Sequence, residues 1–271
     1  MDHGENPIAH SIDINTPSIA RMYDWYLGGT DNFPSDRRAC RALLNIAPCT
    51  RALVRANRLF LERVVRVLAR EYGVRQFLDF GSGLPVRNNV HQVAQSVDRS
   101  SRVVYIDNDP IVLAHGRTLL DENDETTIVR AEMTDIDGTL DHPDVTDFID
   151  RDAPVAALFV SGLHRVPDPP GPQSVIQRVA GRLAPGSFLV FCHLVSDSAA
   201  VRQAATDFML RTTGRNWGRV RERSDVDGYV SGMKLLAPGL VEVSAWRPDS
   251  HVTPQQHTRR WQEYGGVVCL P

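Results

Sequence analysis

Apolar residues form two patterns that alternate between about residue 76 and residue 194. Short runs rich in β-branched and aromatic residues predict five strands at residues 76–80, 102–106, 126–130, 154–160 and 188–194. Between them, apolar residues at helical spacing predict helices at residues 88–97 and 173–183, and a third that begins at Pro110. Strands that alternate with helices are typical of a parallel sheet covered by helices, so we expect an α/β fold.

The two ends of the chain depart from this alternation. Before the first strand the pattern predicts helices at residues 18–29, 35–44 and 51–71, which we assign to an N-terminal helical segment, residues 1–72. After the fifth strand it predicts helices at residues 197–211 and 228–236 and strands at residues 240–246 and 265–270. Because no long helix separates the last two strands, we expect an antiparallel hairpin at the sheet edge, within one unit that spans residues 73–271.

The turn after the first strand is the first candidate site. Gly81-Ser82-Gly83-Leu84 follows Asp79 and precedes a predicted helix, and glycines there let the backbone approach a ligand closely. A dinucleotide-binding turn would have glycine or alanine at residue 86, where this chain has Val86. An acid two residues before the first glycine instead resembles the D-x-G-x-G loop of class I methyltransferases, in which an acid faces the ammonium of S-adenosylmethionine. An ordinary strand–helix connection is the alternative.

The end of the second strand is the next candidate. Asp107 lies 26 residues after Gly81, where nucleoside-binding folds place an acid that accepts hydrogen bonds from both ribose hydroxyls. The alternative is an acid that caps the helix beginning at Pro110, and this role suits Asp109 better than Asp107. Asn108 stands between the two acids and belongs to the same candidate site.

A histidine follows the fourth strand. Ser161 and His164 stand just past its carboxyl end, where ligands of open α/β sheets bind. A neutral imidazole there could act as a base or orient a substrate, so His164 is the candidate catalytic residue. A structural histidine bonded to the backbone is the alternative, and His193 is a weaker second candidate.

Composition and charge exclude several classes of protein. A chain of 271 residues with 42% hydrophobic content can bury a substantial core, and its net charge of −3 argues against nonspecific nucleic-acid binding. The four cysteines lack the spacing of a zinc site or a disulfide framework. No apolar run approaches the ~18 residues of a membrane span. We therefore expect a cytoplasmic protein that acts on a small molecule, with no metal, nucleic-acid or membrane partner.

The sequence as a whole resembles the actinobacterial S-adenosyl methyltransferase family, long known as a domain of unknown function. The matching motifs include Ala20-Arg21-Met22-Tyr23-Asp24, Leu27-Gly28-Gly29, Asp31-Asn32-Phe33, Arg55-Ala56-Asn57-Arg58, Phe77-Leu78-Asp79, Gly83-Leu84-Pro85, Asp107-Asn108-Asp109-Pro110 and Val166-Pro167-Asp168. The resemblance implies S-adenosylmethionine as cofactor and a Rossmann-like seven-stranded sheet of order 3-2-1-4-5-7-6 with a helical N-terminal lid. It names no substrate.

The resemblance extends the candidate cofactor site. The third strand's tip would lie over the adenine, where Glu132 or Asp135 would accept from the amino group and the Met133 backbone would meet the ring; the sequence does not rank the two acids. The N-terminal segment adds the polar and aromatic candidates Tyr23, Asn32, Asn57 and Arg58. Asn57 falls in the buried stripe of its helix, so its amide is either tied to the N-terminal segment or reaches a ligand. Arg58 could instead be surface charge.

The sequence therefore predicts methyl transfer from S-adenosylmethionine to an unidentified small-molecule nucleophile. A cofactor-binding protein without transferase activity is the first alternative. A nicotinamide-dependent reductase is the second, disfavoured by Val86 and Asp79.

Overall fold

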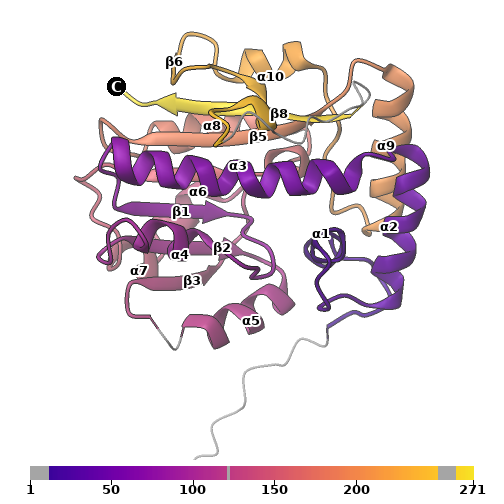
Figure 1. Ribbon diagram of the computed structural model, residues 1–271, viewed down its shortest axis with the longest axis horizontal. Helices are drawn as coiled ribbons and strands as arrows, with labels where there is room; N and C mark the ends of the chain where they lie inside the picture. The colour runs from indigo at the N-terminus through magenta and orange to yellow at the C-terminus, as the bar shows by residue number, and fades with distance from the viewer. Residues whose placement is uncertain (1–11, 121–122, 250–260) are drawn as a thin grey trace, which may run out of the picture.

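An eight-stranded sheet forms the centre of the protein (Figure 1). The computed structural model describes residues 12–120, 123–249 and 261–271. The five parallel strands are β1 (Gln76–Phe80), β2 (Arg102–Asp107), β3 (Thr126–Arg130), β4 (Ala156–Phe159) and β5 (Phe188–Val195). β8 (Gln262–Cys269) runs antiparallel to β5 and pairs with the short strands β6 (Lys234–Leu235) and β7 (Val241–Glu242). The order β3-β2-β1-β4-β5-β8-β6 confirms the predicted arrangement, with the last strand of the chain inserted beside β5.

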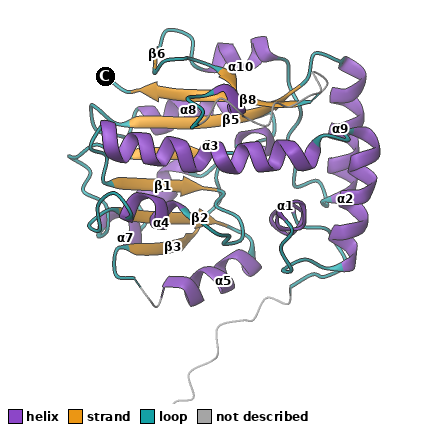
Figure 2. Ribbon diagram, viewed as in Figure 1, coloured by secondary structure: helices purple, strands orange, loops and turns teal. Residues whose placement is uncertain are grey.

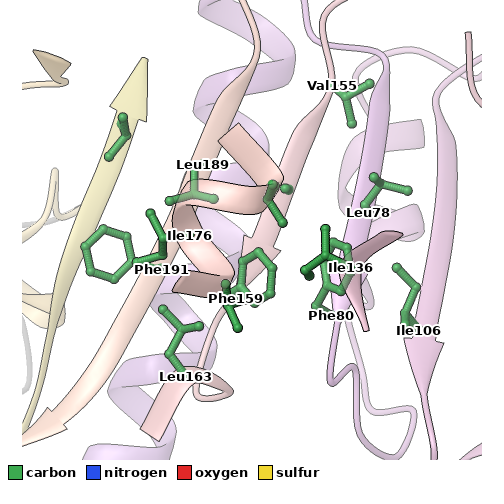
Figure 3. Packing of buried hydrophobic residues seen from close by; sticks show 14 of the residues in the cluster. Leu78, Phe80, Ile106, Ile136, Val155, Phe159, Leu163, Ile176, Leu189 and Phe191 are labelled. Carbon is green, nitrogen blue, oxygen red and sulfur yellow. The ribbon is translucent and has the colours of Figure 1, made fainter. Parts of the chain in front are cut away.

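Helices cover both faces of the sheet (Figure 2). On one face lie α3 (Thr50–Glu71) and α4 (Val90–Gln95); the other face carries α6 (Ile136–Leu140), α8 (Pro172–Ala180) and α10 (Arg223–Tyr229). Neighbouring residues of β1 point to opposite faces, so Phe77 packs under α3 while Phe80 joins the other cluster and stacks on Phe159 at 4.5 Å (Figure 3). Both sides of the central strands are therefore apolar, as the unbroken apolar runs predicted.

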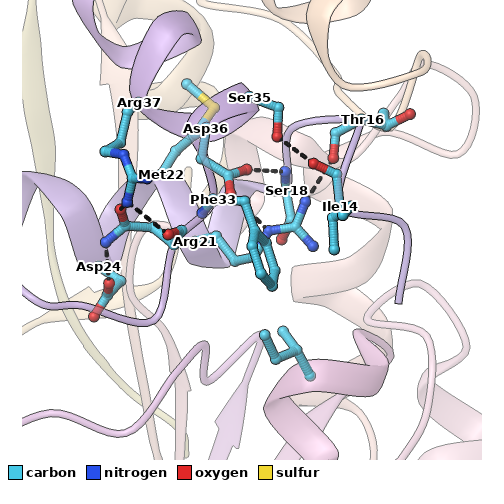
Figure 4. Close-up of polar contacts among 12 residues, drawn as sticks. Ile14, Thr16, Ser18, Arg21, Met22, Asp24, Phe33, Ser35, Asp36 and Arg37 are labelled. Carbon is cyan, nitrogen blue, oxygen red and sulfur yellow. Dashed lines mark hydrogen bonds and ion pairs between the residues drawn. The ribbon is translucent and has the colours of Figure 1, made fainter. Parts of the chain in front are cut away.

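The first two helices, α1 (Ile19–Leu27) and α2 (Pro34–Ile46), lie beyond the carboxyl ends of the parallel strands (Figure 1). α1 packs on α2 and α3, and α2 packs on α9 (Ala199–Thr212). The buried Arg21 guanidinium holds this segment together: its Nε donates to Asp36 Oδ2 at 2.9 Å, and an Nη donates to the Thr16 carbonyl (Figure 4). Asp36 is fully buried and also accepts from the main-chain N–H groups of Ser18 and Phe33.

The C-terminal part departs from the prediction. The prediction of a helix at residues 228–236 was wrong, because α10 ends at Tyr229 and Lys234–Leu235 forms β6. The strand expected at residues 240–246 is only Val241–Glu242, because the Glu242 carboxylate accepts from Ser244 N and begins the 3-10 helix η2 (Val243–Ala245). This turn buries Trp246 against Phe60 of α3. An alternating pattern cannot distinguish such a turn from a strand.

Some short or edge helices also differ from the prediction. α4 begins at Val90 rather than residue 88, since Asn88 has a positive φ and Asn89 caps the helix. α5 (Pro110–Leu120) begins at Pro110, as predicted, and packs against β3. The sequence did not reveal α6 or α7 (Pro143–Thr146), since five- and four-residue helices carry too little periodicity to detect. Among the described residues, no helix is long and apolar enough to cross a membrane.

Candidate cofactor site and acceptor cavity

A crevice runs along the carboxyl ends of β1 to β4, beneath α1. Three adjoining cavities of about 350, 220 and 70 Å³ form it. Asp107 and Asn108 line the first two, Gly81 lines the last two, and Arg165 lines all three. Ligands of open α/β sheets bind at this edge, so the crevice is the candidate cofactor site.

The glycine turn after β1 forms one wall of the crevice. Gly81 and Gly83 have φ of +71° and +70°, which other residues adopt only with strain. A Cβ on Gly81 would lie 2.8 Å from Met133 Cε, whereas a Cβ on Gly83 would enter open space. Ser82 lines the crevice with both glycines, and Leu84, beside them, also packs on α5. The turn therefore leaves a backbone surface that a ligand can approach closely.

Asp79 is a buried acid that lacks a partner. Its carboxylate takes part in none of the hydrogen bonds and ion pairs within the described residues, although Asp79 is only 5% exposed. Burial raises the pKa of Asp79 to about 7, with the nearby Arg58 opposing this shift and Asp107 adding to it. The carboxylate lines the 70 Å³ cavity with Arg58. A buried carboxylate that makes no hydrogen bond or ion pair beside a cavity suits a cationic ligand group.

Asp107 binds two backbone N–H groups and faces the crevice. Its Oδ2 accepts from Gly83 N and its Oδ1 from Asp109 N, both at 2.9 Å. Each carboxylate oxygen keeps a further lone pair for a hydroxyl donor. Asp109 is the capping acid: its Oδ1 accepts from Ile111 N at 3.0 Å, and its Oδ2 accepts from the Ser18 hydroxyl at 2.5 Å. Asp109 therefore has the capping role expected from the sequence, and Asp107 lines the crevice.

The two acids after β3, Glu132 and Asp135, have different surroundings. Glu132 and Met133 line the 220 Å³ cavity, and Asn108 Nδ2 donates to Glu132 Oε1 at 2.6 Å. Asp135 lines none of the three crevice cavities; its Oδ1 accepts from Gly138 N at 3.1 Å and caps α6. Glu132 is therefore the acid in position to meet a ligand at the tip of β3.

The candidate residues of the N-terminal segment also fall into two groups, those that line the crevice and those that contact only other residues of the protein. Tyr23 and Arg58 line the crevice, and Arg58 Nη2 also donates to the Asn88 carbonyl at 2.5 Å. Asn57 lines none of the cavities; its amide donates to the Tyr23 hydroxyl at 3.4 Å and accepts from the Cys192 thiol at 3.4 Å. Asn32 holds the loop after α1 by donating to Asp24 Oδ2 at 2.7 Å. The contacts of Asn57 match the structural alternative for this residue.

His164 lies in a separate, smaller cavity of about 60 Å³ on the far side of Tyr23 and Ser161, here named the inner cavity. Its ring lies 4.8 Å from that of Trp217, and its Nδ1 has no hydrogen-bond partner among the described residues. Burial, with His193 adding to it, holds the pKa of His164 well below its usual range, so the ring is neutral at pH 7. A neutral imidazole in a cavity can accept a proton or orient an acceptor.

His193 has a structural environment. Its Nδ1 donates to the Leu194 carbonyl at 2.8 Å, which leaves Nε2 to accept from Arg221 Nη1 at 3.1 Å. Arg221 is in turn paired with Asp168 at 2.8 Å. These contacts fix one neutral tautomer and occupy both ring nitrogens.

Sequence reasoning missed two residues at the site. Arg165 lines every part of the crevice, and its Nε is buried without a hydrogen bond. Glu263 lines the inner cavity, fully buried, and Ser161 Oγ donates to its Oε1 at 2.9 Å. Arg165 directly follows His164 and could have been included with it. Glu263 carried no signal, because the last strand was expected to begin at residue 265.

The strand order, the glycine turn and the acids at the ends of β1 and β2 define the Rossmann-like methyltransferase class. The chain belongs to the S-adenosyl methyltransferase family, which it matches over residues 5–271. It is similar to a candidate methyltransferase from Thermobifida fusca YX, with 36% identity over 96% of this chain and 97% of that one and a TM-score of 0.87. A DUF574-family protein from Streptomyces avermitilis shows 34% identity over 96% and 100% of the two chains, also with a TM-score of 0.87. No curated protein matches the chain.

Proposed function

We propose that this protein transfers a methyl group from S-adenosylmethionine to a nucleophilic O, N or C atom of a small molecule. The observation that carries the proposal is the buried Asp79 carboxylate, which has no partner within the described residues and lies beside a glycine turn with open space over Gly83. A bound ammonium would supply the hydrogen-bond donor and the direct ion pair that this carboxylate lacks. Because Gly81 and Gly83 have no side chains, the rest of the ligand's amino-acid moiety could lie against the main chain of the turn.

The crevice residues fit the other parts of this cofactor. Asp107 would accept from the ribose hydroxyls, and Glu132 with the Met133 backbone would meet the adenine in the 220 Å³ cavity. Gly81, Ser82, Gly83 and Leu84 would carry the methionine moiety beside Asp79 and Arg58. When bound, the cofactor supplies a methyl group activated by a sulfonium.

The chain's own residues would position the acceptor and exclude water. α1 places Ile19 and Tyr23 over the junction between the crevice and the inner cavity, which supports a lid role for the N-terminal segment. Methyl transfer depends mainly on in-line placement of the nucleophile in a dry site. His164, neutral and in the inner cavity, would orient or deprotonate the acceptor.

Binding experiments test the cofactor assignment. Native mass spectrometry of freshly purified protein should show a co-purifying adenosyl ligand. Calorimetry should show binding of S-adenosylhomocysteine and no measurable binding of NADH or NADPH. Preferential binding of NADPH would reject the proposal in favour of a reductase. A cofactor-binding protein without transferase activity would bind S-adenosylhomocysteine equally well and would show no turnover with any acceptor.

A further inference from the structure

The inner cavity concentrates buried polar atoms that have no partner. Nine buried side-chain N or O atoms of the described residues lack a hydrogen bond, and four belong to residues that line this one cavity. They are His164 Nδ1, Trp217 Nε1, Trp261 Nε1 and Glu263 Oε2. Because an unpaired buried polar atom costs about 1–3 kcal/mol, four such atoms on residues that line one space indicate that a polar ligand completes them.

The charged groups that line the cavity are of one sign within the part of the chain that the structure describes. Glu263 is the only carboxylic acid among these described lining residues, and none of them is an arginine or lysine. The rings of Tyr23, Tyr26, Trp217 and Trp261 supply most of the aromatic wall. Aromatic faces and a carboxylate both attract a cation, whereas an anionic acceptor would meet Glu263 without a counter-charge.

Glu263 also lies next to the cofactor site. Its partner Ser161, together with Tyr23, lines both the inner cavity and the 70 Å³ part of the crevice. Ser161 has a φ of +62°, an uncommon conformation for a residue with a side chain, at the point where the two spaces meet. The Glu263–Ser161 pair is therefore beside the place where an acceptor atom would meet the methyl group.

We infer that the inner cavity binds the acceptor, that this acceptor is a small primary or secondary amine, and that Glu263 binds its ammonium and takes its proton. This inference rests on the proposed methyl transfer and names its acceptor class. The cavity of about 60 Å³ holds only the reacting end of the molecule. His164 and the two indole N–H groups would bind its remaining polar atoms.

The chemistry balances without another reactant. The ammonium gives one proton to Glu263 Oε2 and becomes an amine with a free lone pair. That lone pair forms the N–C bond while the electron pair of the S–C bond returns to sulfur, so the positive charge passes from sulfonium to the methylated ammonium. The proton on Glu263 leaves to solvent when the products depart. Burial raises the pKa of Glu263 to about 7, which suits a group that must both take and release a proton.

A matched series of small molecules tests the inference. Propylamine, propanol and propionate are titrated into protein saturated with S-adenosylhomocysteine, and tryptophan fluorescence reports binding because Trp217 and Trp261 line the cavity. We expect propylamine to bind most tightly of the three. E263Q should weaken propylamine binding at least tenfold. Its affinity for S-adenosylhomocysteine should stay within twofold of the wild-type value. E71Q is the control: Glu71 ends α3, pairs with Arg247 and does not line the cavity, so propylamine affinity should stay within twofold.

Several outcomes would overturn the inference. Propanol or propionate binding as tightly as propylamine contradicts the amine class, as does no binding of propylamine. Unchanged propylamine affinity in E263Q contradicts the role of Glu263. Should E263Q fail to fold, E263D keeps the carboxylate, and loss of the amine preference in that variant rejects the inference. Failure of the wild-type protein to bind S-adenosylhomocysteine is a different result, which rejects the proposed function and the inference with it.

Discussion

The Asp107 carboxylate accepts a hydrogen bond from the main-chain N–H of Gly83, with 2.9 Å between Oδ2 and the nitrogen. This contact ties the end of β2 to the glycine turn after β1, so one side chain both shapes the turn and faces the crevice. Replacing Asp107 would therefore remove a ligand contact and also release the turn.

Asp107→Ala should weaken binding of S-adenosylhomocysteine by about ten- to a hundredfold, measured by calorimetry. The reason is the loss of charge-assisted hydrogen bonds of roughly 1.5–3 kcal/mol. Asp107→Asn should reduce this affinity less, because the remaining side-chain oxygen can still accept a hydrogen bond from the ligand. The control is Asp109→Ala, which removes the cap on Ile111 N and should lower stability by about 1 kcal/mol while sparing binding. The reverse result would exchange the roles of the two acids.

Gly83→Ala should abolish cofactor binding at a modest cost in stability. The positive φ costs roughly 1–2 kcal/mol, and the new methyl group enters the space that we assign to the cofactor. Gly73→Ala is a matched control, because Gly73 has a φ of +68° and open space around it but lies outside the crevice. Thermal melts should show similar losses for both variants. Intact binding in Gly83→Ala would place the cofactor elsewhere.

Cofactor affinity should rise with pH through the pKa of Asp79. Between its ordinary pKa of 3.8 and about 7, the folded protein holds a proton that the unfolded chain has lost, so this acid lowers stability as pH rises. A bound ammonium requires the ionised form. Affinity for S-adenosylhomocysteine should therefore be about tenfold weaker at pH 6 than at pH 8.

Calorimetry at pH 6 in two buffers of different ionisation enthalpy should accordingly show release of nearly one proton. Asp79→Asn should remove both the release and the pH dependence. E263Q, which alters the other buried acid with a pKa near 7, should keep them. A release that persists in Asp79→Asn would mean that another group provides the proton.

Arg21→Ala should destabilise the N-terminal helices by about 3–5 kcal/mol, since it leaves the fully buried Asp36 carboxylate without its counter-charge. Because α1 lines the crevice, affinity for S-adenosylhomocysteine should fall in the same variant. Arg66→Ala removes an exposed ion pair with Asp249 and should cost no more than about 1 kcal/mol. Full affinity in a destabilised Arg21→Ala protein would show that the segment is not a lid.

His164→Ala should leave affinity for S-adenosylhomocysteine nearly intact and should lower turnover once an acceptor is known. His193→Ala should instead lower the melting temperature, since it removes the contacts with Leu194 and Arg221. A His164→Ala protein with a reduced melting temperature and normal turnover would make His164 structural. A normal melting temperature together with normal turnover in His164→Ala would exclude both a catalytic and a structural role for His164.

The sequence by itself determined the strands, most of the helices and the acids at the ends of β1 and β2. These features depend on local patterns: an unbroken apolar run makes a buried strand, and parallel strands bring their carboxyl ends to one edge wherever the helices lie. The distinction between Asp107 and Asp109 could also be made locally, because a helix cap has a fixed position before Pro110.

Only the tertiary structure decided which polar groups were already satisfied. Asp135 caps α6 and Asn57 is bonded to Tyr23 and Cys192, whereas Glu132 faces the crevice; nothing in the residue types separates these cases. Glu263 reaches the inner cavity because β8 pairs with β5 over its full length, which brings Glu263 beside Ser161, 102 residues away in the chain. Such contacts depend on long-range pairing and on competition among hydrogen-bond partners, and local periodicity encodes neither.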